Sequence, residues 1–169
     1  MLLIEKQKTK QKLLRFTHLM KIRKADKKDI EDSLSIVEEL KEWFTKEAIK
    51  NMKVDFTVNN LVVAVEKNKV VGFLCFNYYE GIFKILWMGV KKNLQSSGIG
   101  SLLVKWLEKE AKKIKSKSIE VETLTDEDDY EPYKLTRAFY YKHGFKKLYI
   151  KKARKKGWDD QVVLRTAVR

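Results

Sequence analysis

The stretch from Trp87 to Ile114 constrains the fold more than any other part of the chain. It predicts a buried strand, a short polar loop, a glycine turn and a long amphipathic helix. Glycines just before a helix leave backbone N–H groups unpaired, and the positive end of the helix dipole adds to them. Glycine also lets a ligand approach the backbone closely. The loop from Gln95 to Gly100 is therefore predicted to bind a phosphate or diphosphate.

The residues around these glycines exclude two common phosphate-binding motifs. The P-loop ends in Gly-Lys-Ser or Gly-Lys-Thr, and neither follows Gly100. The dinucleotide-binding motif needs three glycines spaced G-x-G-x-x-G, whereas only Gly98 and Gly100 are present here. What is left is the pattern Q-x-x-G-x-G between a predicted strand and a predicted helix.

The length of 169 residues predicts one domain over residues 20–169, preceded by a basic N-terminal extension over residues 1–19. The only cysteine, Cys75, has no partner for an internal disulfide, which favours a reducing, cytoplasmic location. The apolar run at the N-terminus is only Leu2-Leu3-Ile4, so we expect no signal peptide and no membrane span. No spacing of cysteines and histidines predicts a metal site.

The formal net charge of +14 admits two interpretations. The positive charge could serve to bind a polyanionic partner such as nucleic acid, an acidic protein or a cofactor polyphosphate. Alternatively, the lysines cover solvated faces in general. We favour the second interpretation for most of the charge, because basic residues occur in every segment rather than along one stripe.

The hydrophobic periodicity predicts a mixed α/β (α+β) fold with a mostly antiparallel sheet flanked by helices. The fourth and fifth strands are joined by a helical crossover, so they are predicted to be parallel. Strands are expected at residues 20–24, 61–65, 70–79, 82–90, 118–124, 145–150 and 161–166, and helices at 27–43, 45–52, 98–114 and 132–143.

Two motifs on these elements resemble those of the GNAT N-acetyltransferase superfamily. The Q-x-x-G-x-G loop is similar to the family's acetyl-coenzyme A signature. The segment Phe139-Tyr140-Tyr141-Lys142-His143-Gly144-Phe145 looks like its F-Y-x-x-x-G-F signature at a helix end. The element order is also that of the GNAT fold, and the resemblance covers about residues 20–167. It implies acetyl-coenzyme A as the cosubstrate, without a metal.

The resemblance further implies where the cosubstrate binds. In GNAT enzymes the fourth and fifth strands splay apart and the pantetheine arm lies between them. The backbone of Met88 and Val90 would hold the thioester carbonyl and the pantetheine amides. Tyr140 lies where the family places the tyrosine that protonates the departing thiolate. The diphosphate would lie on the loop residues Gln95, Ser96, Ser97, Gly98, Ile99, Gly100 and Ser101.

The sequence departs from the family pattern in three places. Ser96 and Ser97 stand where many members have basic residues, so Lys91 and Lys92 are candidates to replace that charge. Tyr133 stands where many members have asparagine. A glutamate base is found in some members four residues before the oxyanion backbone, but the residue here is Lys84. The general base is therefore unassigned, with Glu80, Glu122 or a water relay as candidates.

Other residues have a functional and a structural interpretation. Cys75 lies in an alternating apolar strand with no histidine near it in sequence, which favours a core residue over a nucleophile. His143 is interpreted as a helix-end residue. The acidic run over residues 126–131 is interpreted as support for the following helix rather than as a site for a cationic acceptor.

The sequence therefore predicts an N-acetyltransferase that transfers acetyl from acetyl-coenzyme A to a primary amine by direct attack in a ternary complex. The acceptor, a small molecule or a protein, is not identified. The alternative is a non-catalytic basic module on the same fold that binds nucleic acid or protein. Nucleic acid and membrane are not expected as partners, because no recognition motif is present, and a homodimer is left open.

Overall fold

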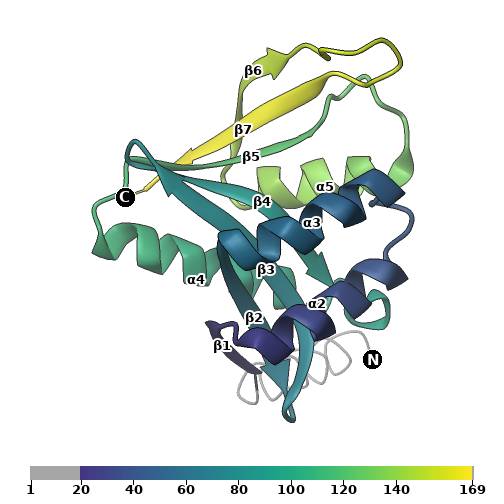
Figure 1. Cartoon of the computed structure of the whole chain (residues 1–169). Helices are drawn as coiled ribbons and strands as arrows, with labels where there is room; N and C mark the ends of the chain where they lie inside the picture. The colour runs from purple at the N-terminus through teal and green to yellow at the C-terminus, as the bar shows by residue number, and fades with distance from the viewer. Residues whose placement is uncertain (1–19, 169) are drawn as a thin grey trace, which may run out of the picture.

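The computed structural model describes residues 20–168 of the chain. Residues 1–19, where the basic extension is predicted, and residue 169 lie outside the described part. The elements follow the predicted order (Figure 1). They are β1 (Met20–Lys24), α2 (Lys27–Glu39), α3 (Lys46–Val58), β2 (Asn60–Glu66), β3 (Lys69–Tyr79), β4 (Ile82–Val90), the 3-10 helix η1 (Lys92–Leu94), α4 (Ile99–Lys113), β5 (Ser118–Leu124), α5 (Glu131–Lys142), β6 (Lys146–Lys151) and β7 (Gln161–Ala167).

The strands form one seven-stranded sheet in the order β1-β2-β3-β4-β5-β7-β6. Figure 1 shows β1 and β2 at one end of the sheet and the yellow-green β6 and yellow β7 at the other. Every pair of neighbours is antiparallel except β4 and β5, which are parallel as the crossover predicts. The predicted fold class is confirmed. The sequence did not show that β7 inserts between β5 and β6.

Helices cover both faces of the sheet and create two hydrophobic cores. One core lies under α4 and α5 and includes Leu103, Leu107, Val121 and Phe145. The other lies under α2 and α3, where Ile36, Met52 and Phe56 meet the opposite face of β2 and β3. The described helices include none long and apolar enough to cross a membrane.

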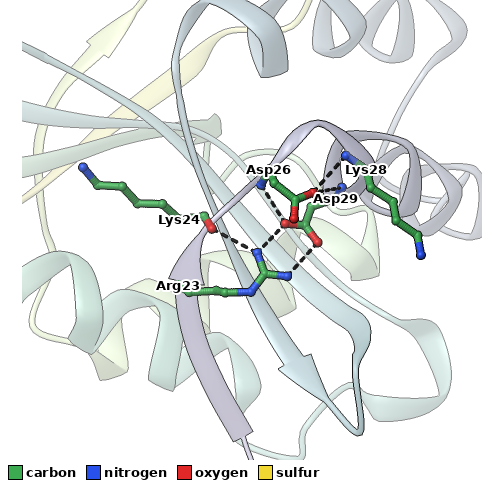
Figure 2. A network of polar contacts seen from close by, with 5 residues as sticks. All are labelled: Arg23, Lys24, Asp26, Lys28 and Asp29. Atoms are coloured by element: carbon green, nitrogen blue, oxygen red, sulfur yellow. Dashed lines mark hydrogen bonds and ion pairs between the residues drawn. The ribbon is translucent and has the colours of Figure 1, made fainter.

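A polar network fixes the start of α2 (Figure 2). The Asp26 carboxylate accepts hydrogen bonds from the backbone N–H groups of Lys28 (2.9 Å) and Asp29 (3.1 Å), and Asp29 accepts one from the Asp26 N–H at 2.7 Å. Arg23 of β1 donates to Asp29 as well, with Nη2 3.0 Å from Oδ1. Burial of the Asp29 carboxyl acts against its charged form, yet these bonds hold its pKa below the usual range. The Asp26 side chain therefore caps α2, and the bond from Arg23 ties the cap to β1 of the sheet.

Two helix boundaries differ from the sequence prediction. Helix α2 ends at Glu39 instead of about Trp43, because the Trp43 N–H closes a turn on the Leu40 carbonyl at 3.0 Å. Helix α3 continues to Val58, six residues beyond the predicted end. Its extension includes Phe56, which packs edge-on against Phe73 with ring centroids 5.1 Å apart. Tertiary packing here outweighs the weak helix propensity of the local sequence.

Gly89 allows α2 to pack closely on β4. A Cβ atom added at this position would lie 2.7 Å from Phe73 Cε1 and 3.1 Å from Leu40 Cδ1. Phe73 is fully buried and Leu40 is nearly so, which leaves neither side chain room to move aside. The position therefore needs a residue without a side chain.

We predict that Gly89→Ala destabilises the protein by about 1–3 kcal/mol through overpacking. Denaturant unfolding measures the change. Val58→Ala is the matched control, because Val58 is 70% exposed and its truncation should change stability by less than about 0.5 kcal/mol. Equal stability of Gly89→Ala and the wild type would show that the contact with Phe73 is not tight.

Candidate active site

The parallel strands β4 and β5 pair over only part of their lengths. Their register runs from Ile82↔Ser118 to Ile85↔Val121 and then stops. Strand β4 nevertheless continues to Val90, and β5 continues to Leu124. A V-shaped gap therefore opens between the two strands beyond Ile85 and Val121.

A β-bulge in β4 lies where the gap opens. Opposite β3, Ile85 pairs with Phe76 and Trp87 pairs with Cys75, which leaves Leu86 without a partner. Leu86 and Trp87 both pack on the core under α2 and α3, whereas Met88 and Val90 pack on the core under α4 and α5. Bulges bend a strand and re-aim its side chains, as this one does.

The backbone of Met88 and Val90 faces the gap. The Lys91 N–H donates to the Val71 carbonyl of β3 at 3.0 Å. Because strand N–H groups alternate in direction, those of Met88 and Val90 point away from β3, to the side that β5 has left. Val90 lies opposite Gly72 and Met88 lies opposite Leu74, at positions of the antiparallel ladder that exchange no hydrogen bonds. The gap thus presents free backbone donors and acceptors along β4.

The loop after β4 ends at the N-terminus of α4. The first hydrogen bond within α4 runs from the Leu102 N–H to the Gly98 carbonyl at 3.1 Å. The N–H groups of Ile99, Gly100 and Ser101 therefore have no partner within the helix. The Ile99 side chain is only 1% exposed, so Ile99 can contribute to binding through its backbone alone. The loop itself is held by the Ser97 hydroxyl, which donates to the Leu94 carbonyl at 2.5 Å.

The two loop glycines have different roles. Gly98 has a φ of +93°, and a Cβ added there would meet nothing within 4 Å. A Cβ added at Gly100 would instead lie 3.2 Å from the Phe139 ring of α5. Only Gly98 leaves open space in front of the helix, whereas Gly100 allows α5 to pack against α4. A side chain at Gly100 would therefore meet the Phe139 ring rather than the open space in front of the helix. Gln95 and Ser96 lie on the exposed part of the loop.

The charge expected from Lys91 and Lys92 is partly compensated. Lys92 forms an ion pair with Glu42, which follows α2 in the chain. Both side chains are substantially exposed, so the pair contributes little to stability. Its consequence is that the Lys92 ammonium is shared with a carboxylate rather than free for an anion.

Tyr140 lies in the core under α4 and α5 with 4% of its surface exposed. Its ring packs edge-on against Phe139 and Phe145, with centroids 5.2 Å away in each case. Burial raises the pKa of the phenol above its ordinary value. Tyr140 is therefore protonated at neutral pH, and among residues 20–168 no hydrogen bond to its hydroxyl is found.

The carboxylates considered as a general base lie in different places. Glu80 belongs to the β3–β4 turn, at the end of β4 where pairing with β5 is intact. Met88 is eight residues further along, roughly 25 Å at about 3.3 Å per residue, so Glu80 cannot reach the gap. Glu122 lies on the splayed part of β5 and forms an ion pair with Lys151 at 2.7 Å. Lys84 lies in the paired segment beside Glu120.

The structure also brings together residues that sequence reasoning did not connect. The Tyr133 hydroxyl donates to the Trp43 carbonyl at 2.6 Å, and the Trp43 indole donates to the Pro132 carbonyl at 3.2 Å. The Trp87 indole donates to Asp55 of α3 at 2.6 Å. Trp43 and Tyr133 are ninety residues apart in sequence, and no periodic pattern relates such distant positions. The two bonds of Trp43 hold the segment after α2 against the start of α5.

The acidic run before α5 contacts that helix, in line with its interpretation as support for the helix. Arg137, 4% exposed, donates to the carbonyls of Leu124 (3.2 Å) and Asp128 (2.9 Å) and pairs with Asp126 at 3.1 Å. Lys134 pairs with Asp129 at 3.2 Å. The run is thus tied to α5. Within the described part of the chain, no cluster of three or more metal-binding side chains is found.

Comparison with known proteins places the chain in a family. The model of the acetyltransferase (GNAT) domain matches residues 58–147, which include β4, the glycine loop, β5 and α5. The chain belongs to this family. The sequence has no match among curated proteins.

Three solved structures share the fold. A protein from Desulfovibrio desulfuricans assigned to the GNAT acetyltransferase family superposes with a TM-score of 0.77 and 22% identity, over 89% of this chain and 99% of that one. Ard1 from Thermoplasma volcanium gives 0.69 and 23%, over 89% and 99%. PaiA N-acetyltransferase from Thermoplasma acidophilum, in complex with coenzyme A, gives 0.67 and 18%, over 88% and 98%. Likenesses at these identities establish the fold alone.

Cys75 is a core residue, as its strand pattern predicts. Its side chain is fully buried, and burial, with a contribution from the nearby Asp55 charge, raises the pKa of the thiol to about 12. A thiol that stays protonated is a poor nucleophile. We therefore exclude an acetyl-enzyme step at this residue.

We predict that Ellman's reagent labels Cys75 at pH 8 only when the protein is unfolded. In the unfolded chain the thiol ionises near its ordinary value of 9.0. Its contribution to stability is therefore complete below pH 9 and is lost as the pH rises towards 12, by at most about 1.4 kcal/mol per pH unit. Cys75→Ala should flatten this alkaline decline. Rapid labelling of the folded protein would contradict the assignment.

Proposed function

We propose that this protein transfers an acetyl group from acetyl-coenzyme A to a primary amine by direct attack in a ternary complex. The observation that carries the proposal is the gap between β4 and β5. It begins at a bulge, it has free backbone donors on one wall, and it leads to a helix N-terminus with unpaired N–H groups. A thioester with a long amide-bearing arm and a diphosphate matches this succession of groups.

The residues fit the cosubstrate in a specific arrangement. The N–H groups of Met88 and Val90 are suited to the thioester carbonyl and the pantetheine amides. The loop from Gln95 to Ser101 is suited to the diphosphate, with open space in front of Gly98. Family membership supports this arrangement, since the matched residues 58–147 include both the strand and the loop.

The proposed reaction balances without a metal or a covalent enzyme intermediate. The amine nitrogen forms a bond to the acetyl carbon, and the carbon–sulfur bond breaks. The amine loses one proton to Glu122 or to water, and the sulfur receives one proton from the Tyr140 hydroxyl. A phenol is protonated at neutral pH, so Tyr140 has a proton to give to the departing thiolate.

Calorimetric titration with acetyl-coenzyme A tests the site through a matched pair of variants. We predict that Gly98→Glu raises the Kd at least roughly tenfold, because the carboxylate occupies the space in front of α4 and repels the diphosphate. Gly157→Glu is the control: Gly157 also has a positive φ, of +84°, and no atom within 4 Å of an added Cβ, but it lies in the β6–β7 connection. Its Kd should match the wild type.

The same titration decides between the enzyme and a basic binding module. Saturable binding of acetyl-coenzyme A, with weak and salt-sensitive binding of duplex DNA, supports the enzyme. A wild type that binds DNA but no acetyl-coenzyme A would overturn the proposed function.

We further predict that Tyr140→Phe lowers kcat at least roughly tenfold and leaves the Kd for acetyl-coenzyme A unchanged, since acid–base groups supply about 10²–10⁴-fold. Thiol release that depends on an added amine measures the rate. Tyr141→Phe is the control, because Tyr141 is exposed and bonds to Asp126. A Tyr140→Phe enzyme as fast as the wild type would remove Tyr140 from the mechanism.

A further inference from the structure

A histidine and a serine connect the ends of the two helices that meet at the glycine loop. His143, the C-cap of α5, places Nε2 2.9 Å from the hydroxyl of Ser101 in the first turn of α4. Its Nδ1 lies 2.8 Å from the carbonyl oxygen of Phe139. The ring also packs against the Phe139 ring, tilted by 38° with centroids 4.3 Å apart. The imidazole is thus fixed on three sides.

These contacts determine which ring nitrogen carries a proton. A carbonyl oxygen can only accept, so Nδ1 must carry the hydrogen that faces Phe139. In the neutral ring Nε2 is then a bare acceptor, and the Ser101 hydroxyl must donate its hydrogen to it. In the protonated ring Nε2 donates to the Ser101 oxygen, and the hydroxyl hydrogen is free to point elsewhere. The direction in which Ser101 donates therefore depends on one proton.

We propose that His143 is a positioning residue for the diphosphate and takes up a proton when the diphosphate binds, so that Ser101 can donate to it. This inference rests on the proposed function, which places the diphosphate at the N-terminus of α4. A phosphate oxygen is an acceptor and gains nothing from a serine whose hydrogen is already donated to His143. Protonation of the ring releases that hydrogen and also brings a positive charge near the anion.

The ionisable side chains near the His143–Ser101 pair in sequence are lysines and tyrosines. Lys105 of α4, Lys142 of α5 and Lys146 of β6 are exposed, and Tyr140 and Tyr141 of α5 are uncharged at neutral pH because burial raises the pKa of each phenol. The ring's contacts with Phe139 and Ser101 are uncharged. Histidine is the side chain that most readily changes its charge under physiological conditions, so an anion bound beside the ring can draw a proton onto it.

Calorimetry in buffers of different ionisation enthalpy measures the proton directly. We expect dephospho-coenzyme A to bind at pH 7 with net proton uptake. This ligand keeps the diphosphate and lacks the terminal phosphate monoester, which would itself titrate near pH ~6. The uptake should vanish in His143→Gln, whose amide can contact Ser101 without changing its charge, and in Ser101→Ala. His18→Gln is the control and should keep the uptake, because His18 is the other histidine of the chain.

Affinity and ring spectra provide a second readout. The wild type should bind dephospho-coenzyme A on the order of tenfold more tightly at pH 6 than at pH 8, whereas His143→Gln should show little change over that range. Nitrogen-15 spectra should show Nε2 of His143 gaining a hydrogen on binding. Binding without proton uptake in the wild type would overturn this inference and leave the proposed function intact. Failure of the wild type to bind acetyl-coenzyme A would overturn both.

Discussion

The interrupted pairing between β4 and β5 is the constraint on which the site depends. Each strand keeps a complete partner on its other side: β4 pairs with β3 and β5 pairs with β7 along their lengths. The strands can therefore part beyond Ile85 and Val121 without losing their places in the sheet. Backbone groups left unpaired in a buried place are costly, about 1–3 kcal/mol each. A gap of this kind is stable when water or a ligand with amides and carbonyls occupies it.

The bulge at Leu86 determines which face of the sheet the neighbouring residues of β4 pack on, at the point where the gap opens. It sends Leu86 and Trp87 to the face covered by α2 and α3, where the Trp87 indole bonds to Asp55. It returns Met88 and Val90 to the face covered by α4 and α5. Trp87 meets the Phe44 ring edge-on at 6.2 Å on one face of the sheet, whereas the next residue of the strand, Met88, packs on the other face. These two consecutive residues therefore lie on opposite faces of the sheet near the point where the gap opens.

The sequence was sufficient to predict most elements, because their signals are local. Turns Lys67-Asn68 and Glu80-Gly81 adopt positive φ angles as hairpin turns do, and β1, β4 and β5 have the predicted bounds. At α4, Val104 is buried, whereas the C-cap Ile114 is 49% exposed and is followed by a turn at Lys115, whose φ is +54°. The bulge, the insertion of β7 and the Trp43–Tyr133 contact depend on residues far apart in sequence, for which periodicity carries no signal.

The two family motifs lie next to each other in the structure and contact one another. The glycine loop begins α4 and the F-Y-x-x-x-G-F segment ends α5, some forty residues later in the chain. Gly100 leaves space for the Phe139 ring, and one residue further on, Ser101 meets His143 one turn after Phe139. Gly100 thus serves the contact between helices, and that contact brings the His143 ring to the first turn of α4. The first turn of α4 is consequently built together with the end of α5, so under the proposed function a change in α5 would alter diphosphate binding without touching the ligand.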